Sequence, residues 1–278
     1  MTDSSPPNTE KLNMENKEKI ILVTNDDGIF AAGLHNLVEA VRDLGRVYVV
    51  APDSPQSGKG HAVTLRKPLW FNRVDTFGEI EAWESSGTPV DCVKWAKNVL
   101  LKNKTIDLCV SGINHGANYS INIIYSGTMS AAMEAAFEGI HSVGFSLLDF
   151  SPDADFTEAK KSAAEISRFV LAQKPDPHQP LLLNVNIPAL PAHQIKGTKV
   201  CRQAHARWVE EFKEAHDPHG NKYYWLAGEF VNLDRGKDTD VKALEDGYIS
   251  VVPCQFDLTR YEAFDQLTEL HHEKKKVG

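Results

Sequence analysis

Short runs of aliphatic and β-branched residues alternate with segments of helical period along most of this chain. The first run, IILVT at 20–24, ends at Asn25, and a second run, RVYVVAP, occupies 46–52. Between them the apolar positions recur at helical spacing and stop before Gly45: Leu34, Leu37, Val38, Val41 and Leu44. A strand, a helix and a strand joined by short connections predict a βαβ unit whose two strands are parallel.

The same alternation continues to about residue 187. We expect buried strands at 106–114, 140–147 and 181–187, and helices at 91–100, 129–139 and 156–172. At the start of the helix at 91–100, Thr88 can be the N-cap, Pro89 the first helical residue and Asp91 the acidic partner three positions after the cap. This order predicts an α/β protein with a mostly parallel sheet, in which ligands bind beyond the carboxyl ends of the strands.

Strands dominate after Thr198. The segments 199–212 and 223–231 flank HDPHGN at 216–221, which predicts a protruding β-hairpin within 198–247, and a last strand follows at 248–258. The turn residues favour a hairpin tip over a metal site for His205, His216 and His219. Four aromatic residues of this region pack on the core or form an interface between subunits: Trp208, Tyr223, Tyr224 and Trp225.

Composition narrows the class of protein. The 278 residues are 42% hydrophobic and 24% charged, as in a globular protein, and a net charge of -8 argues against binding a nucleic-acid polymer or an acidic membrane. Residues 1–18 lack the apolar core of a secretory signal, so we expect a disordered leader there and a C-terminal tail at 261–278. The four cysteines form no CxxC pair, and together with the lack of a membrane-spanning apolar run they predict a cytoplasmic protein.

The chemistry begins where the first strand ends. Asn25-Asp26-Asp27-Gly28 places two adjacent carboxylates at the functional edge of the predicted sheet. A plain turn explains these residue types equally well when they are taken alone. Buried together, however, the two anions would need a compensating charge, and a divalent cation is the simplest one.

Three further segments supply polar groups at the same edge. Ser57 lies in the loop after the second strand, Asn114 ends the strand at 106–114, and Ser126-Gly127-Thr128 starts a helix whose free amides suit an anion. Gly58-Lys59 does not make a phosphate-binding P-loop, because the upstream glycine and the following Ser or Thr are missing. Two carboxylates, a hydroxyl and an amide oxygen suit Mg²⁺ or Mn²⁺.

These groups predict metal-assisted hydrolysis of a phosphoester by a water bound to the metal. Asp26 or Asp27 would orient or deprotonate this water, and a covalent phosphate on Asp26 is a weaker alternative because both carboxylates are needed as ligands. His61 and His115 lie in the site loops. Each is a candidate proton donor to the leaving oxygen, with loop packing or surface exposure as the alternative.

Seven motifs in order resemble the SurE survival-protein family, whose members are 5'-nucleotidases. The resemblance covers about 19–260 and rests on these segments: NDDG (25–28), APDSPQSGKGHAVTL (51–65), SGTPVDCV (86–93), VSGINHGANYS (110–120), YSGTMSAAMEAAFEGIHSVGFSL (125–147), LLNVNIP (182–188) and TDVKALEDGYISVVPCQFDLT (239–259). It implies a single Rossmann-like domain of three α/β/α layers. It also implies a C-terminal hairpin extension that assembles subunits into a homodimer or homotetramer.

The resemblance further implies hydrolysis of nucleoside 5'-monophosphates, and possibly 3'-monophosphates, with one Mg²⁺ or Mn²⁺ per subunit. The family's metal ligands fall on Asp26, Asp27, Ser57 and Asn114, and its phosphate-binding residues on Asn118, Ser126, Gly127 and Thr128. Many relatives carry arginine where this chain has Gln56, a loss expected to weaken substrate binding and to leave metal binding intact. A non-catalytic nucleotide-binding protein on the same fold is the alternative function.

Overall fold

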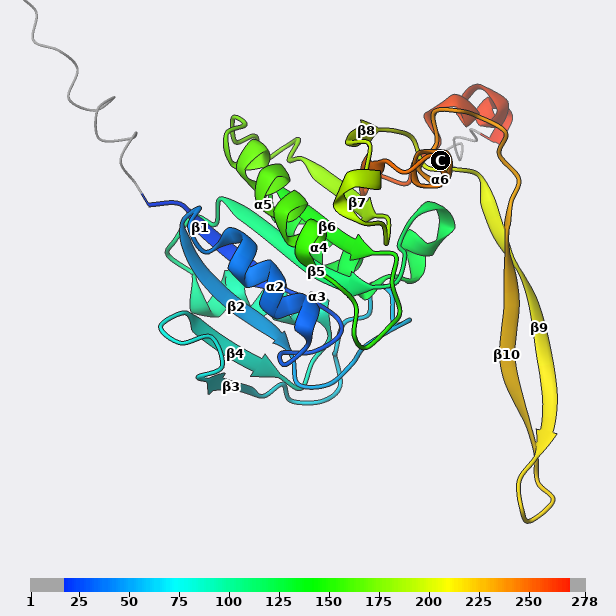
Figure 1. Ribbon diagram of the computed structural model, residues 1–278, viewed down its shortest axis with the longest axis horizontal. Coiled ribbons are helices and arrows are strands. Elements are labelled where there is room, and N and C mark those ends of the chain that lie inside the picture. Colours follow the sequence, from blue (N-terminus) through cyan, green and yellow to red (C-terminus); the bar gives the residue numbers. More distant parts are fainter. Residues whose placement is uncertain (1–17, 271–278) are drawn as a thin grey trace, which may run out of the picture.

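A nine-stranded sheet forms the centre of the computed structural model, which describes residues 18–270 (Figure 1). Six neighbouring strands are parallel, whereas β3 runs antiparallel to β4. At the other edge β11 is antiparallel to β7 and parallel to β8. The order across the sheet is β3 (Phe71–Val74), β4 (Glu81–Ser85), β2 (Arg46–Pro52), β1 (Ile20–Thr24), β5 (Leu108–His115), β6 (Ser142–Leu147), β7 (Leu182–Ile187), β11 (Ile249–Pro253) and β8 (Thr198–Val200).

Helices cover both faces of the sheet. One face packs against α2 (Ala32–Val41) and α5 (Thr157–Leu171), and the other against α3 (Pro89–Trp95) and α4 (Gly127–Phe137). The short helix α6 (Asp240–Glu245) precedes β11. These layers confirm the predicted three-layer α/β/α fold with a mostly parallel sheet. No helix within 18–270 is long and apolar enough to cross a membrane.

The apolar pattern of the strands explains why the sheet is buried on both faces. Every residue of β1, β6 and β7 is buried, as parallel strands between two helical layers require. Thr88 caps α3 as predicted: its side chain accepts the Asp91 amide, and the Asp91 carboxylate accepts the Thr88 amide. The predicted helix at 91–100 is α-helical only to Trp95 and continues as a π-helical turn over Ala96–Leu100.

Several elements have no counterpart in the sequence prediction. Strands β3 and β4 and helix α6 are all short, at four to six residues, and the two strands mix polar and apolar positions. Residues 261–270 of the predicted tail form two 3₁₀ helices, Tyr261–Ala263 and Asp265–Leu270. The leader up to residue 17 and the end of the tail from 271 lie outside the described residues.

A long arm leaves the body after β8 (Figure 1). It is an antiparallel ribbon of β9 (Ala206–His216) and β10 (Lys222–Asn232), with its tip at the predicted turn. Near its root the Trp208 indole donates to the Asn122 side chain at 2.8 Å. The predicted strand at 199–212 is therefore wrong as one element, since the chain leaves the sheet at Cys201 and re-forms a strand in the arm.

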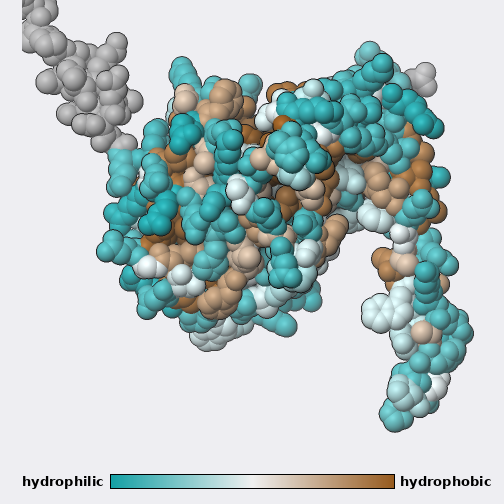
Figure 2. Space-filling model, in the orientation of Figure 1, coloured by the Kyte–Doolittle hydropathy of each residue, from teal (hydrophilic) through white to brown (hydrophobic). Residues whose placement is uncertain are grey.

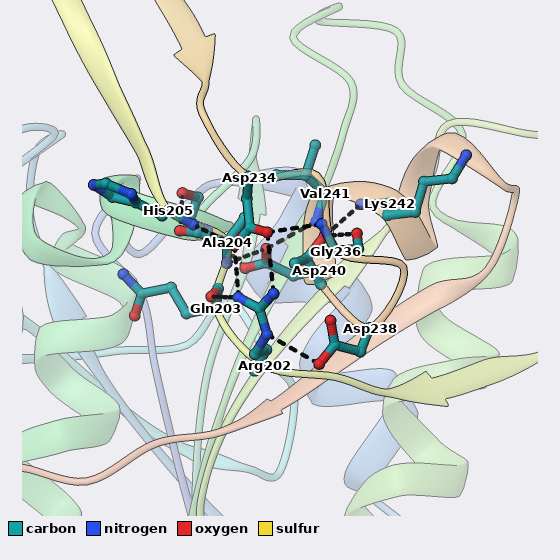
Figure 3. Close-up of polar contacts among 12 residues, drawn as sticks. Arg202, Gln203, Ala204, His205, Asp234, Gly236, Asp238, Asp240, Val241 and Lys242 are labelled. Atoms are coloured by element: carbon teal, nitrogen blue, oxygen red, sulfur yellow. Dashed lines mark hydrogen bonds and ion pairs between the residues drawn. The ribbon is translucent and has the colours of Figure 1, made fainter.

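The root of the arm is held by a polar cluster (Figure 3). The Arg202 guanidinium binds both oxygens of Asp234, at 2.6 and 3.0 Å, and also Asp238 at 3.0 Å. The fully buried Asp240 carboxylate accepts the amides of Ala204 and Ser120 at 2.9 and 2.7 Å. These bonds interrupt the strand after Cys201, because the Arg202 amide donates to the Asp238 carbonyl and the amides of Ala204 and His205 donate to the carboxylates of Asp240 and Asp234.

One close approach positions the edge of the sheet that carries Asn114. An alanine Cβ at Gly33 of α2 would lie 1.9 Å from the Ile113 carbonyl oxygen. Helical Gly→Ala changes normally stabilise by about 1 kcal/mol. We expect Gly33→Ala to lower the free energy of unfolding by about 2 kcal/mol or more, since backbone must move. Chemical denaturation measures it, with Asn36→Ala on the same helix as the control; an unchanged or higher stability would contradict this packing.

Candidate functional site

The two predicted carboxylates stand at the end of β1, and a local turn aims them. The Asn25 side chain donates to the Gly28 carbonyl at 3.0 Å and accepts the Gly28 amide at 3.2 Å. Gly28 has a φ of 106°, which favours glycine. The turn leaves Asp26 buried and Asp27 half-buried. The residues that form a turn are therefore also the ones that position the two carboxylates.

The loop that carries Ser57 contacts this turn through the backbone. The Gln56 amide donates to the Asp26 carbonyl at 2.7 Å, which places Ser57 one residue from the carboxylate pair. Ser57 itself is exposed. The Gln56 side chain is buried and turned into its own loop, where its amide nitrogen donates to the Ser54 carbonyl at 3.1 Å and its oxygen accepts from the Lys59 ammonium.

Asn114 arrives from β5 with its side-chain amide fixed. The amide nitrogen donates to the carbonyls of His115 and Gly116 at 3.1 and 2.8 Å, which leaves the side-chain oxygen as the group available to a ligand. The next backbone amide, that of His115, donates to the Asp27 carboxylate at 3.4 Å. The ends of β1 and β5 therefore present oxygens side by side.

The N-terminus of α4 lies directly against Asp26. Ser126 caps the helix by accepting the Met129 amide at 3.0 Å, and the Thr128 hydroxyl donates to the Asp26 carboxylate. A Cβ at Gly127 would lie 2.6 Å from the Asp26 Cβ and 2.7 Å from its Oδ2. Only glycine permits this approach, and the positive end of an eleven-residue helix faces the carboxylate pair as a result.

The electrostatics of the pair are unfavourable for two anions. Burial and then the Asp27 charge raise the pKa of Asp26 to about 6, against the opposing hydrogen bond from Thr128. Burial also raises the pKa of Asp27. Within residues 18–270 no side-chain nitrogen of lysine, arginine or histidine lies within 4.0 Å of either carboxylate. The charge of His115 lowers the pKa of Asp27, but less than burial raises it, so the protein compensates the pair only in part.

This donor set fits a hard divalent cation. Two carboxylates without a basic partner, an amide oxygen held in place and a nearby exposed hydroxyl are ligands that Mg²⁺ and Mn²⁺ accept. No group of three His, Cys, Asp or Glu side chains that could hold a metal occurs in the part of the chain that the structure describes. Any site here therefore depends on the mixed set of oxygens rather than on a cluster of charged ligands.

Comparisons with known proteins agree with this geometry. The sequence model of the family described as Survival protein SurE matches residues 21–210. The chain is 55% identical to a 5'-nucleotidase SurE of Christiangramia forsetii, over 92% of this chain and 98% of that protein, and 53% identical to one of Cytophaga hutchinsonii, over 89% and 95%. The crystal structure of the SurE protein from Aquifex aeolicus is 40% identical, covers 90% of this chain and 99% of its own, and superposes with a TM-score of 0.77.

The chain belongs to the SurE family. The resemblance read from seven motifs is confirmed, and with it the Rossmann-like fold. The four predicted metal ligands come from the ends of β1, β2 and β5, whereas the phosphate-binding segment comes from the start of α4. Their roles stay predictions, since the structure contains the protein alone.

Asn118 is placed differently from the other predicted SurE site residues. Its side-chain nitrogen donates to the Ser146 hydroxyl at 2.8 Å, and its backbone bonds with the side chains of Asn186 and Asn184, each at 2.8 Å. These bonds fix Asn118 in a buried amide network over β6 and β7. Its predicted contact with phosphate would have to come from the second N–H of the side chain, because the amide oxygen, like the phosphate oxygens, only accepts hydrogen bonds.

The sequence prediction missed a carboxylate next to the site. Glu134 of α4 is buried and binds the His61 ring at 2.9 Å and the Lys94 ammonium. His61, a candidate proton donor, is thereby tied to α4, and the other candidate, His115, packs its ring edge-on against Phe156 at 5.0 Å. No sequence signal marks Glu134, because a single glutamate in an alanine-rich helix is typical of an exposed face.

The raised pKa of Asp26 has a measurable consequence. In the folded state this carboxyl holds its proton up to about pH 6, because burial raises its pKa from the ordinary aspartate value of 3.8. The metal-free protein therefore loses stability as the pH rises through this window. We expect Asp26→Asn, which keeps the acceptor for Thr128, to raise the free energy of unfolding at pH 7.5 by about 2 kcal/mol.

Denaturant titration with a chelator at pH 7.5 and pH 3.5 measures this effect. The gain should largely disappear at the lower pH, where Asp26 is protonated in the folded state and mostly protonated in the unfolded state. Asp43→Asn, on an exposed carboxylate away from the site, is the control. Destabilisation by Asp26→Asn at neutral pH would show that the carboxylate is compensated within the protein.

Proposed function

We propose that this protein is a metal-dependent 5'-nucleotidase, which hydrolyses nucleoside 5'-monophosphates to nucleoside and phosphate. The observation that carries the proposal is the meeting of four segments at an only partly compensated pair of carboxylates on a helix N-terminus. The full-length relatives that share 53–55% of its residues are named 5'-nucleotidase SurE. The chain retains both aspartates, Ser57 and Asn114, a set that nucleotide binding alone would not need.

Different segments of the site bind the metal and the phosphate. Asp26, Asp27, Asn114 and Ser57 hold one Mg²⁺ or Mn²⁺ per subunit through their oxygens. When bound, this cation supplies a Lewis acid for the phosphoryl oxygens and lowers the pKa of water. The start of α4, Ser126-Gly127-Thr128, holds the phosphate through its free backbone amides, because this end of the helix lies against Asp26.

We assign the orientation of the attacking water to Asp27. The Thr128 hydroxyl occupies one oxygen of Asp26, and that carboxylate is buried, whereas Asp27 is half-buried and accepts one long hydrogen bond from His115. Asp27 is therefore the member of the pair that water can reach. A carboxylate in that position can hold and deprotonate the water while the phosphate is held by the helix start.

Phosphate release from AMP and other nucleoside monophosphates tests the proposal. We expect turnover with Mg²⁺ or Mn²⁺, loss of turnover with a chelator, and at least about a 100-fold lower kcat in Asp26→Asn and Asp27→Asn, because each removes a ligand. Asp43→Asn should match the wild type. Hydrolysis that resists the chelator would contradict the proposed metal site. Nucleotide binding without any phosphate release would support the non-catalytic alternative.

We also propose that the chain forms one domain over 19–260 and assembles into a homodimer or homotetramer through the 198–247 region. The arm exposes large apolar side chains on both faces of a two-stranded ribbon, and an isolated ribbon is marginally stable in water. Figure 2 shows pale and brown atoms among the teal ones along the arm. Seven large apolar or aromatic residues of the arm are exposed by 40% or more: Trp208, Val209, Phe212, Tyr223, Tyr224, Trp225 and Leu226.

Sedimentation at micromolar concentration tests the assembly. The wild type should sediment as a dimer or tetramer. Phe212 pairs with Leu226 across the ribbon, and Phe212→Glu, which puts a charge beside that leucine, should shift the protein towards monomer. Lys213→Glu changes charge at the next position, on the opposite face of the ribbon, and should have the smaller effect. A wild type that is monomeric throughout this range would contradict the role of the arm.

A cytoplasmic location is part of the same proposal. All four cysteines are free, and burial raises the pKa of the Cys109 thiol to about 12, which keeps it unreactive. Reduced thiols of this kind suit a reducing compartment.

A further inference from the structure

A cavity of about 480 Å³ opens beside the loop that carries Ser57. Its wall includes Gln56, whose backbone amide donates to the Asp26 carbonyl at 2.7 Å, so this wall is hydrogen-bonded to the segment that carries the carboxylate pair. The opposite wall is the turn after β4, where Ser86 and Thr88 lie. None of the residues assigned above to metal or phosphate binding lines it. Its size suits a nucleoside, since ligand cavities of about 300–1,000 Å³ hold molecules of that class.

Two lysines make this cavity basic in an acidic protein. Lys59 and Lys67 both line it, and within residues 18–270 neither ammonium lies within 4.0 Å of a carboxylate oxygen. The partner of the Lys59 ammonium is the neutral side-chain oxygen of Gln56. The nearby Asp91 carboxylate is occupied by the backbone amides of Thr64 and Thr88, at 3.1 and 2.9 Å. An anion entering the cavity would therefore meet two lysines that no carboxylate neutralises.

An exposed indole completes the lining. The backbone of Trp70 is fixed to Ser86: the Trp70 amide donates to the Ser86 hydroxyl at 3.0 Å, and the Ser86 amide donates to the Trp70 carbonyl at 3.1 Å. The Trp70 side chain nevertheless stays 65% exposed. A large aromatic ring held open on a fixed backbone in the wall of this cavity is suited to stacking on a nucleobase.

We propose that this cavity binds the nucleoside part of the substrate, with the base on Trp70 and a second phosphate between Lys59 and Lys67. The inference rests on the phosphatase activity proposed above and extends it to a preference for nucleotides that carry two separate phosphates. In the reaction, a water oxygen bonds to one phosphorus, the bond from that phosphorus to the nucleoside oxygen breaks, and this oxygen receives a proton. The second phosphate stays on the product and is held by the lysines.

Initial rates with three substrates test the proposal: AMP, adenosine 3',5'-bisphosphate and ribose 5-phosphate, each with Mg²⁺. Whichever phosphate of the bisphosphate is cleaved, the other is available to the lysines. We expect kcat/KM for the bisphosphate to exceed that for AMP by about 10-fold, and Lys59→Gln and Lys67→Gln each to reduce this ratio by about 3-fold through KM. Lys161→Gln, an exposed lysine of α5, controls for the loss of one positive charge.

Trp70→Leu separates base stacking from phosphate binding. We expect it to lower kcat/KM for AMP by about 5-fold or more and to leave ribose 5-phosphate, which has no base, unchanged. Equal losses on both substrates would overturn the assignment of Trp70. A bisphosphate-to-AMP ratio that stays the same in Lys59→Gln, Lys67→Gln and Lys161→Gln would overturn the second phosphate site.

Failure of the subsite and failure of the nucleotidase are distinguishable. If the wild type hydrolyses AMP but the ratios do not respond, only the cavity assignment is wrong. If it hydrolyses none of the three substrates, the activity proposed above is wrong, and calorimetric binding of adenosine 3',5'-bisphosphate then decides the cavity. Binding weakened in Lys59→Gln and Trp70→Leu but not in Lys161→Gln would support it, and equal binding in all variants would overturn it.

Discussion

Burial of two adjacent carboxylates is the constraint around which this structure is arranged. Asp26 and Asp27 follow a fully buried strand, so their charges leave bulk water, and within residues 18–270 no basic side-chain nitrogen lies within 4.0 Å of them. It supplies instead a hydroxyl from Thr128 and the positive end of a helix. Such neutral and partial charges lower the cost of the pair without cancelling it. The remaining cost is what the proposed function assigns to a bound cation.

Close backbone approach makes this arrangement possible. The start of α4 contacts Asp26 because Gly127 has no side chain, and α2 contacts the end of β5 because Gly33 has none. Both glycines lie in helices, where propensity alone favours alanine. Glycine at these two positions lets the helices approach closely enough for oxygens and amides of separate segments to come within hydrogen-bonding range. Part of the helical stability is thus given up to bring oxygens from separate segments together.

The parts of this structure that the sequence predicts are those with a strong local pattern. Long apolar strands, the capped start of α3 and the turn at the arm's tip follow from periodicity and residue type. The edge strands β3 and β4 do not, because four or five residues of mixed polarity carry no period.

In the site, side chains at strand ends could be foreseen, since the carboxyl ends of parallel strands share one edge. The Glu134–His61 pair and the amide network around Asn118 could not. Each joins residues that are 28 to 73 positions apart, and their contacts arise only from tertiary packing.

The buried Asp240 joins two regions that a diagram of the fold separates. One of its oxygens holds the Ala204 amide at the root of the arm, and the other holds the Ser120 amide at the start of the turn that leads into Ser126. The base of the arm and the turn that leads into α4 are therefore tied to each other by hydrogen bonds to one buried carboxylate, so a change at Asp240 would act on both segments at once.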